Sequence, residues 1–175
     1  MGRVRTALPH RSEAKRSGRL PVMLTMLLAA GVLTLLAACD ERVVYHTYRT
    51  LPLSGWSGTD TLLLPALSLD AAMTYQVSVT VRNHSTYPYR NLPLLICCTD
   101  SLGQRVYADT LQVQLADAVG NWQGNGLGGL YEQTTAAGTL YAPHGGSYLF
   151  TINHLLPDAP LSGINDVGIK VSQKE

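Results

Sequence analysis

The sequence lacks the short patterns that mark most catalytic and metal sites. It has no G-x-S-x-G motif and no local Cys/His arrangement, which argues against a hydrolase with an activated nucleophile. It has no H-x-x-x-H or H-x-H spacing and no EF-hand-type loop, which argues against zinc and calcium. Few glutamates follow residue 38: Glu41, Glu132 and Glu175. A hydrolase with carboxylates from distant strands stays an open alternative, but we expect no enzyme, no metal and no cofactor.

Charge is also scarce, and its distribution divides the chain. Charged residues make up 14% of the sequence. Residues 1–38 carry six basic residues and one acidic residue, whereas residues 39–175 carry seven basic and eleven acidic residues, for net charges of +5 and −4. Because nucleic acids bind to clustered lysine and arginine, the mildly acidic second part argues against a nucleic-acid partner.

The first 38 residues have the parts of a secretory signal peptide. A basic, polar stretch precedes an uncharged apolar run of 17 residues, Val22–Ala38, which ends in small side chains. The sequence Leu36-Ala37-Ala38-Cys39 has the form of a lipobox, in which the cysteine sulfur takes the diacylglycerol. A further acyl chain such as palmitate on the new N-terminus would complete the stable membrane anchor. An uncleaved transmembrane anchor is the alternative, because the run is near the lower length limit for crossing a bilayer.

Cysteine is rare, and only Cys97 and Cys98 remain beyond Cys39. They are adjacent within an apolar run, so on a strand their side chains point to opposite faces. A disulfide between neighbours would be strained, and the C-x-x-C spacing of a redox pair is absent. We therefore expect two small hydrophobic side chains.

Internal repeats and long segments with helical periodicity are absent too. Short runs rich in Val, Ile, Leu, Thr and Tyr recur instead, divided by Gly, Pro, Asn and Asp. The eight expected strands are Val43–Arg49, Thr61–Leu64, Thr74–Arg82, Leu92–Thr99, Arg105–Leu115, Gly129–Thr134, Gly146–Asn153 and Asn165–Ser172. This pattern predicts an all-β fold, an antiparallel β-sandwich of jelly-roll type with about eight short strands.

The strand pattern also predicts the domain organisation. After the signal peptide, residues 39–60 hold the lipidated cysteine and a tether, and residues 61–175 form the sandwich, which the run Val43–Arg49 joins as a first strand. The run Thr74–Arg82 alternates apolar and polar residues, as a strand with one buried face does. The run Leu92–Thr99 is apolar on both faces, which indicates a central strand.

The glycine-rich stretch Gly120–Gly129 is one candidate site. It contains Gly124-x-Gly126, but no helix pattern follows, as a dinucleotide-binding fingerprint would require. We interpret it as a bend where residues need positive φ. Trp122 in this stretch either closes the edge of the sandwich or is an exposed anchor for a protein partner, because tryptophan is favoured at binding hot spots.

A second candidate site lies between two expected strands. It comprises Arg82, Asn83, Tyr87, Tyr89, Arg90 and Asn91. One interpretation is a plain turn, in which Pro88 restricts the backbone and an asparagine side chain forms a hydrogen bond to it. The other is a recognition loop, in which tyrosines and arginines stack and donate hydrogen bonds around a rigid turn. Together with Trp122, these residues form the predicted partner-binding set.

The order and spacing of short fragments beyond Cys39 resemble the GldH family of gliding-motility lipoproteins. The fragments include Val81-Arg82-Asn83, Tyr87-Pro88-Tyr89, Gly120-Asn121-Trp122-Gln123-Gly124 and Leu161-Ser162-Gly163-Ile164-Asn165-Asp166-Val167-Gly168-Ile169. The sequence departs from the family at Thr99–Gly103, where members often have a Pro-Asp-Gly turn, and at Leu155-Leu156, where they often have Met-Arg.

The resemblance implies a membrane-anchored, non-enzymatic accessory protein linked to surface gliding machinery and its associated protein-secretion system. The expected location is the cell envelope, with the periplasmic side of the outer membrane favoured, and the expected partners are other envelope proteins. A carbohydrate-binding envelope module is the alternative. Jelly rolls often bind glycans, and Trp56, Trp122 or Tyr87 would stack on sugars if exposed.

Overall fold

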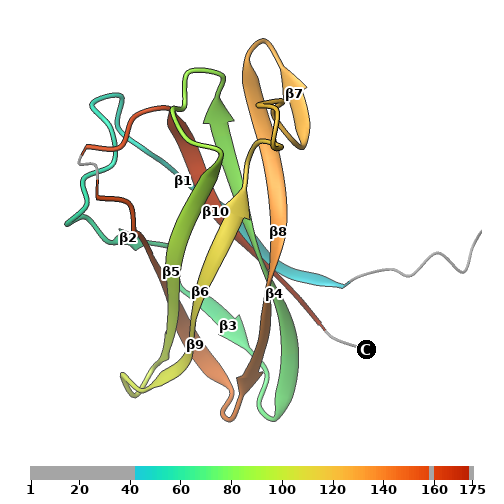
Figure 1. Ribbon diagram of the computed structural model, residues 1–175. Coiled ribbons are helices and arrows are strands. Elements are labelled where there is room, and N and C mark those ends of the chain that lie inside the picture. Colours follow the sequence, from blue (N-terminus) through green and yellow to red (C-terminus); the bar gives the residue numbers. More distant parts are fainter. Residues whose placement is uncertain (1–41, 158–159, 174–175) are drawn as a thin grey trace, which may run out of the picture. The chain divides into compact units, whose positions relative to one another are not determined.

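The computed structural model describes residues 42–157 and 160–173, which Figure 1 shows as a ribbon. The predicted signal peptide, residues 1–38, and Cys39 lie outside the described residues. In the part of the chain that is described, no helix is long and apolar enough to cross a membrane. Every paired strand is antiparallel to its neighbour, so the all-β prediction is confirmed.

The described residues form ten strands in two sheets. The strands are β1 (Val43–Thr50), β2 (Leu62–Leu63), β3 (Leu67–Leu69), β4 (Met73–His84), β5 (Asn91–Asp100), β6 (Arg105–Gln114), β7 (Asn125–Leu127), β8 (Leu130–Ala142), β9 (Gly146–His154) and β10 (Ile164–Gln173). Sheet I has the order β1-β10-β4-β8-β7, and sheet II has the order β2-β9-β5-β6, with β3 also paired to β9. If β2–β3 and β7–β8 each count as one strand, the first strand pairs with the last, the second with the seventh and the third with the sixth. This is the jelly-roll order.

The core fills the space between the two sheets, and β4 and β5 contribute to it as predicted. On β4, Tyr75, Val77, Val79 and Val81 are buried in the core, as the alternation predicts. Ser78 and Thr80 on the other face are buried as well, so the middle of this strand does not have the single buried face that was expected. Strand β5 pairs with β9 on one side and β6 on the other, so its predicted central place is also confirmed.

The two cysteines of β5 point to opposite faces, as predicted. Cys98 is buried in the core and Cys97 is half-buried on the outer face of sheet II, and both are free thiols. Burial raises the pKa of the Cys98 thiol to about 12, so this thiol stays protonated and behaves as a small hydrophobic side chain.

Each expected strand overlaps an observed strand, but the sequence reasoning missed β3 and β7 and ended β8 too early. Strand β8 continues to Ala142 rather than ending at Thr134. Ala137 has no partner in the register, where Ser78 pairs with Ala136 and Val77 with Gly138. This bulge, next to a glycine with φ of +126°, breaks the alternation that marks a strand.

The run Val43–Arg49 joins the sandwich as its first strand, as predicted, and residues 51–60, which were expected in the tether, are part of the fold too. Strand β1 pairs with β10 along its length. The following segment, residues 51–60, is packed into the fold through Trp56, whose side chain is 1% exposed. Trp56 and Leu161 exchange two backbone hydrogen bonds of 2.8 Å, so this segment is held as a short ladder.

The sandwich has two ends. Val43 lies beside Ser172 at one end of sheet I, and Thr50 lies beside Asp166 toward the other. We call the first the entry end; it also holds the turns at residues 70–72, 101–104 and 143–145. The opposite end, called the loop end, holds the connections 51–61, 85–90, 115–124 and 128–129 and the described residues 155–157 and 160–163 (Figure 1).

Candidate partner-binding surface at the loop end

The loop end brings together most of the predicted partner-binding set. Asn83 is the second-last residue of β4, Asn91 begins β5, and Tyr87, Tyr89 and Arg90 lie in the connection between these strands. Trp122 lies in the connection between β6 and β7, far away in sequence. Arg82 is separate, because it lies within β4 on the outer face of sheet I.

An aromatic cluster joins the two connections. The ring centroid of Tyr87 lies 5.8 Å from that of Tyr89 and 6.4 Å from that of Trp122, and Trp122 lies 6.0 Å from Tyr131 of β8. The Tyr87 hydroxyl donates a 3.1 Å hydrogen bond to the backbone oxygen of Asn91. Tilted and edge-on contacts of this kind stabilise aromatic clusters beyond the area they bury. The cluster gives the loop end a rigid support.

Burial leaves only some side chains of the predicted partner-binding set accessible to a partner. Asn83 is fully buried and Tyr87 is 3% exposed, and desolvation raises the pKa of the Tyr87 hydroxyl well above its ordinary value. These two side chains support the fold. Tyr89 and Trp122 are half-buried, and Arg90 and Asn91 are exposed.

Arg90 fixes one connection against the other. Its backbone oxygen accepts hydrogen bonds from the amides of Leu115 and Ala116, at 2.8 and 3.1 Å. Its guanidinium Nη1 donates to the backbone oxygen of Ala118 at 3.1 Å. The connections 85–90 and 115–124 are therefore one hydrogen-bonded unit.

Asp117 closes the turn that carries Val119 and Gly120. Its Oδ1 accepts hydrogen bonds from the amides of Val119 and Asn121, at 2.9 and 2.8 Å, and its Oδ2 accepts one from Asn121 Nδ2 at 2.9 Å. These donors, the Asn121 side chain foremost, lower the pKa of the Asp117 carboxyl. The predicted turn at this stretch is confirmed, and so are its positive φ angles, at Gly120, Gly124, Gly128 and Gly129.

The lowered pKa of Asp117 predicts an acid-sensitive turn. The carboxylate stabilises the turn at pH above the ordinary aspartate pKa, and the stabilisation is lost as pH falls through the lowered pKa of the folded state. The amide chemical shifts of Val119 and Asn121 should titrate with a midpoint below about 3.9, and Asp117→Asn should abolish this titration. A midpoint at the ordinary value would contradict the hydrogen bonding described.

Three apolar side chains at the loop end, which sequence reasoning missed, point into solvent. Leu127 on the hairpin of β7 and β8 is 90% exposed, and Leu53 and Val119 on neighbouring connections are exposed as well. Leu127 stands between Gly126 and Gly128, and an isolated leucine among glycines gives no periodic signal. Apolar side chains that gather on an exposed surface can mark a site of protein interaction.

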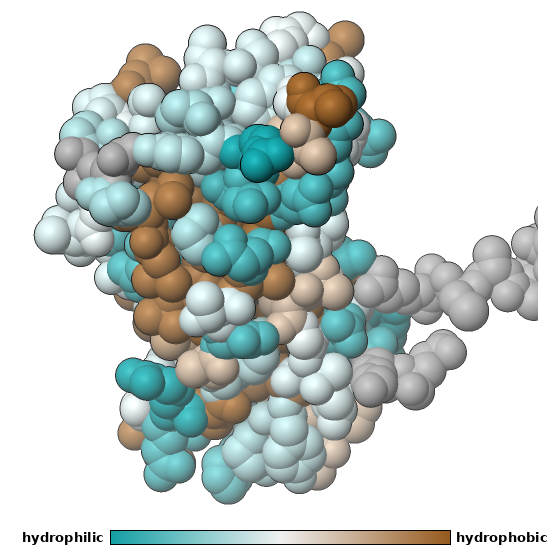
Figure 2. Space-filling view, in the orientation of Figure 1, coloured by the Kyte–Doolittle hydropathy of each residue, from teal (hydrophilic) through white to brown (hydrophobic). Residues whose placement is uncertain are grey.

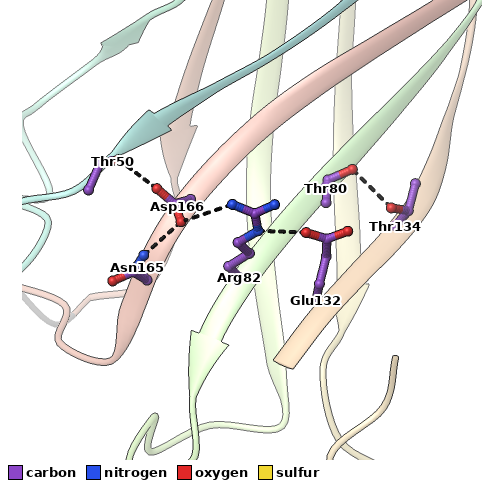
Figure 3. A network of polar contacts seen from close by, with 7 residues as sticks. All are labelled: Thr50, Thr80, Arg82, Glu132, Thr134, Asn165 and Asp166. Atoms are coloured by element: carbon purple, nitrogen blue, oxygen red, sulfur yellow. Dashed lines mark hydrogen bonds and ion pairs between the residues drawn. The ribbon is translucent and has the colours of Figure 1, made fainter. Parts of the chain in front are cut away.

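Beside this hairpin, Arg82 is the centre of a polar network on the outer face of sheet I (Figure 3). Its Nε contacts Glu132 Oε2 of β8 at 2.5 Å, and its Nη1 lies 3.7 Å from Asp166 Oδ2 of β10. The Asp166 carboxylate also accepts hydrogen bonds of 2.6 Å from Thr50 and Asn165.

The network links four strands of sheet I. The guanidinium carbon Cζ of Arg82 lies 4.3 Å from the ring centroid of Tyr48 on β1. At this distance the face of the aromatic ring attracts the cation. The hydrogen bond to Glu132 is the largest of the effects that raise the pKa of Arg82, so the guanidinium stays charged. Arg82, Leu127, Leu130 and Glu132 line a pocket of about 350 Å³ together with Asn125 and Gly126.

Arg82→Met is expected to destabilise the fold by about 1–3 kcal/mol, because it leaves the buried Asp166 carboxylate without its cation. Denaturant unfolding of the variant measures this cost. Arg105→Met, at an exposed position on β6, is the matched control and should change stability by less than about 0.5 kcal/mol. Equal effects of the two substitutions would argue against the network.

The described residues offer little for metal or sugar binding. Within 42–157 and 160–173, no group of three or more His, Cys, Asp or Glu side chains is placed to hold a metal ion. Of the three aromatic residues considered for stacking on sugars, Trp56 and Tyr87 are buried and only Trp122 reaches the surface.

Comparison with known proteins finds relatives whose similarity to this chain extends over almost the whole sandwich. The family model for the GldH lipoprotein matches residues 43–171. The gliding motility lipoprotein GldH of Flavobacterium johnsoniae is 28% identical over 161 residues, which cover 86% of this chain and 96% of the relative. A GldH homolog of Christiangramia forsetii is 24% identical over 149 residues, which cover 81% of this chain and 90% of the relative.

The solved structures found by comparison have low sequence identity to this chain and TM-scores below 0.5. A protein from Sulfurospirillum deleyianum has a TM-score of 0.43 and 10% identity, covering 75% of this chain and 98% of its own. A CBM4 structure has a TM-score of 0.38 and 13% identity, covering 79% of this chain and 81% of its own.

Proposed function

The chain belongs to the GldH lipoprotein family, and on this premise we propose that it is a lipid-anchored, non-enzymatic accessory protein whose loop end binds another envelope protein of a gliding or secretion complex. The family match supports the accessory role, because it extends over residues 43–171, from the start of β1 into β10, and includes the described connections of the loop end.

The lipobox supports the anchoring. Cys39 stands four residues before β1, and β1 begins at the entry end. With a lipid on Cys39, so short a stretch of chain would keep the entry end near the bilayer and leave the loop end free to reach a partner. The periplasmic side of the outer membrane is the location that we propose.

The state of the acidic side chains supports a non-catalytic role. Glu132 and Asp166 are both engaged with Arg82, and Asp117 is engaged with the turn that it closes. These carboxylates form ion pairs and close a turn, and both kinds of contact stabilise the fold. The burial of Trp56 and Tyr87 weighs against the carbohydrate-binding alternative, because a sugar ring needs an exposed aromatic face.

Capture from native membranes tests the proposal. The full chain, tagged at its C-terminus, is isolated from detergent-solubilised membranes, and co-isolated proteins are identified by mass spectrometry. Components of the gliding or secretion apparatus should come down in stoichiometric amounts. Capture of the chain alone, or with glycan, would overturn the proposed role.

Mass spectrometry of the mature N-terminus tests the anchor separately. The expected species begins at Cys39 and carries a diacylglycerol and an acyl chain. Cys39→Ser should prevent this modification. An uncleaved and unmodified chain would contradict the anchoring.

A further inference from the structure

One row of side chains crosses all five strands of sheet I on its outer face. The register aligns Thr50 on β1, Asp166 on β10, Arg82 on β4, Glu132 on β8 and Asn125 on β7. We call these five residues the outer row. Residues that face each other on neighbouring strands interact, and opposite charges in such positions attract. The charges of the outer row alternate in sign across β10, β4 and β8 (Figure 3), and the alternation stops at the uncharged residue of β7.

The outer row has one more negative than positive charge. Two carboxylates share Arg82, with Glu132 at its Nε and Asp166 at its Nη1. The guanidinium also faces Tyr48 of β1, so its charged end is directed toward β1 and β10, away from β7 in the strand order. Lys170, another cation on this face by the register, is four residues from Asp166 along β10, or about 13 Å. On its β7 side, Glu132 therefore faces a strand without a charged residue.

The pocket of about 350 Å³ described above lies at this end of the outer row. In the register, Leu127 of β7 faces Leu130 of β8, and this apolar pair is the next outward pair along the two strands from Asn125 and Glu132. In the space-filling view, apolar and hydrophilic side chains lie side by side over the part of the molecule where β7 lies in Figure 1 (Figure 2). The pocket thus combines apolar side chains with one carboxylate whose charge is only partly compensated.

We propose that this pocket binds a basic side chain, lysine or arginine, of the loop-end partner. The charged end of this side chain continues the alternation of the outer row beside Glu132, and the Asn125 amide oxygen is a further acceptor. The methylene stem packs against Leu130, with Leu127 at the rim, because long basic side chains cover apolar surface with their stems. The inference rests on the proposed function, since it names a chemical feature of the same partner.

Other kinds of side chain fit the pocket less well. The side chain of Glu132 is 37% exposed, and a partner that covers the pocket removes water from this carboxylate. An apolar side chain would then leave the charge desolvated without a new partner, which costs free energy. An acidic side chain would add a third carboxylate to a row with a single guanidinium. A cation gains from the negative charge and also satisfies it.

Glu132→Gln in the full chain tests the inference. The glutamine amide oxygen can still accept the hydrogen bond from Arg82, but it carries no charge. The amount of gliding or secretion components captured from native membranes, identified by mass spectrometry, should fall about tenfold or more, because the partner's cation then loses its counter-charge. Asp109→Asn is the matched control, since Asp109 is an exposed acid on β6 of sheet II, and it should leave capture unchanged. Undiminished capture by Glu132→Gln, or an equal fall in both variants, would overturn the inference.

Salt dependence separates a charge contact from a structural effect of the substitution. Dissolved ions screen the attraction between a partly exposed carboxylate and a cation. Rising salt concentration should therefore weaken capture by the unaltered chain more steeply than the remaining capture by Glu132→Gln. The same salt dependence in both proteins would contradict the inference.

Asn125→Lys is a second variant, and it leaves the pair of Arg82 and Glu132 intact. A lysine of the chain itself opposite Glu132 occupies the place of the partner's cation. Capture should fall about tenfold or more, while the midpoint of thermal unfolding stays the same or rises. Gln112→Lys, at an exposed position on β6, adds the same charge elsewhere and should leave capture unchanged.

The two proposals fail in different ways. Full capture by Asn125→Lys would overturn the basic side chain and leave the loop-end partner in place. No capture by the unaltered chain would overturn the proposed function and this inference together.

Discussion

Trp56→Ala is expected to lower the free energy of unfolding by about 3–5 kcal/mol, the range for loss of a large aromatic side chain from a core. Trp56 is buried to 1% exposure, its indole nitrogen donates a 3.0 Å hydrogen bond to the backbone oxygen of Asp60, and its ring packs edge-on 4.9 Å from His154. Truncation leaves a cavity and removes the side chain that holds residues 51–60 against His154 of β9.

Urea unfolding of the full-length protein in detergent, followed by circular dichroism, measures this loss. Trp122→Ala is the control, because Trp122 is half-buried at the loop end and should cost less than Trp56→Ala. A loss below about 1 kcal/mol for Trp56→Ala would mean that residues 51–60 contribute little to the sandwich. They would then behave as the tether that the sequence predicts.

Gly163→Ala is expected to cost about 2–4 kcal/mol, because two penalties coincide there. The residue has a φ of +85°, a conformation that side chains with a Cβ rarely adopt. A Cβ at this position would also lie 2.7 Å from the Cα and 2.9 Å from the backbone nitrogen of Tyr87. The backbone oxygen of Gly163 accepts a 2.8 Å hydrogen bond from the amide of His84, so the chain cannot move away freely.

Gly103→Ala separates the two penalties. Gly103 has a φ of +76°, but a Cβ there would meet nothing within 4 Å. This variant should therefore show only the conformational cost, about 1–2 kcal/mol. Thermal unfolding of both variants gives the comparison. Equal losses would contradict the close packing of residues 160–163 on the Tyr87 turn.

The parts of the fold that sequence reasoning predicted are those with a local signal. The alternation of Tyr75, Val77, Val79 and Val81 follows from the two-residue period of a strand with one buried face. The apolar run of β5 marked the central strand for the same reason. The tether was misjudged because Trp56 is held by Leu161, more than a hundred residues later, and no local pattern reports such a partner.

The candidate site was predicted less completely, because burial depends on tertiary contacts. The sequence identified the Tyr87 turn and the Trp122 stretch, and the structure joins them in one aromatic cluster. The sequence could not show that Asn83 and Tyr87 are buried, since asparagine is mostly exposed in proteins and tyrosine is found at intermediate burial. Leu127 gave no signal, because a single leucine among glycines has no period.

The central claim is that the loop end binds an envelope partner, and a pair of turn leucines tests it most directly. Leu127 at the loop end is 90% exposed and Leu102 at the entry end is 69% exposed, so aspartate at either position leaves the core intact. Capture of co-isolated proteins from native membranes is measured for Leu127→Asp and Leu102→Asp in the full chain. The account predicts a loss of partner of about tenfold or more for Leu127→Asp and none for Leu102→Asp. Undiminished capture by Leu127→Asp, or loss only in Leu102→Asp, would contradict it.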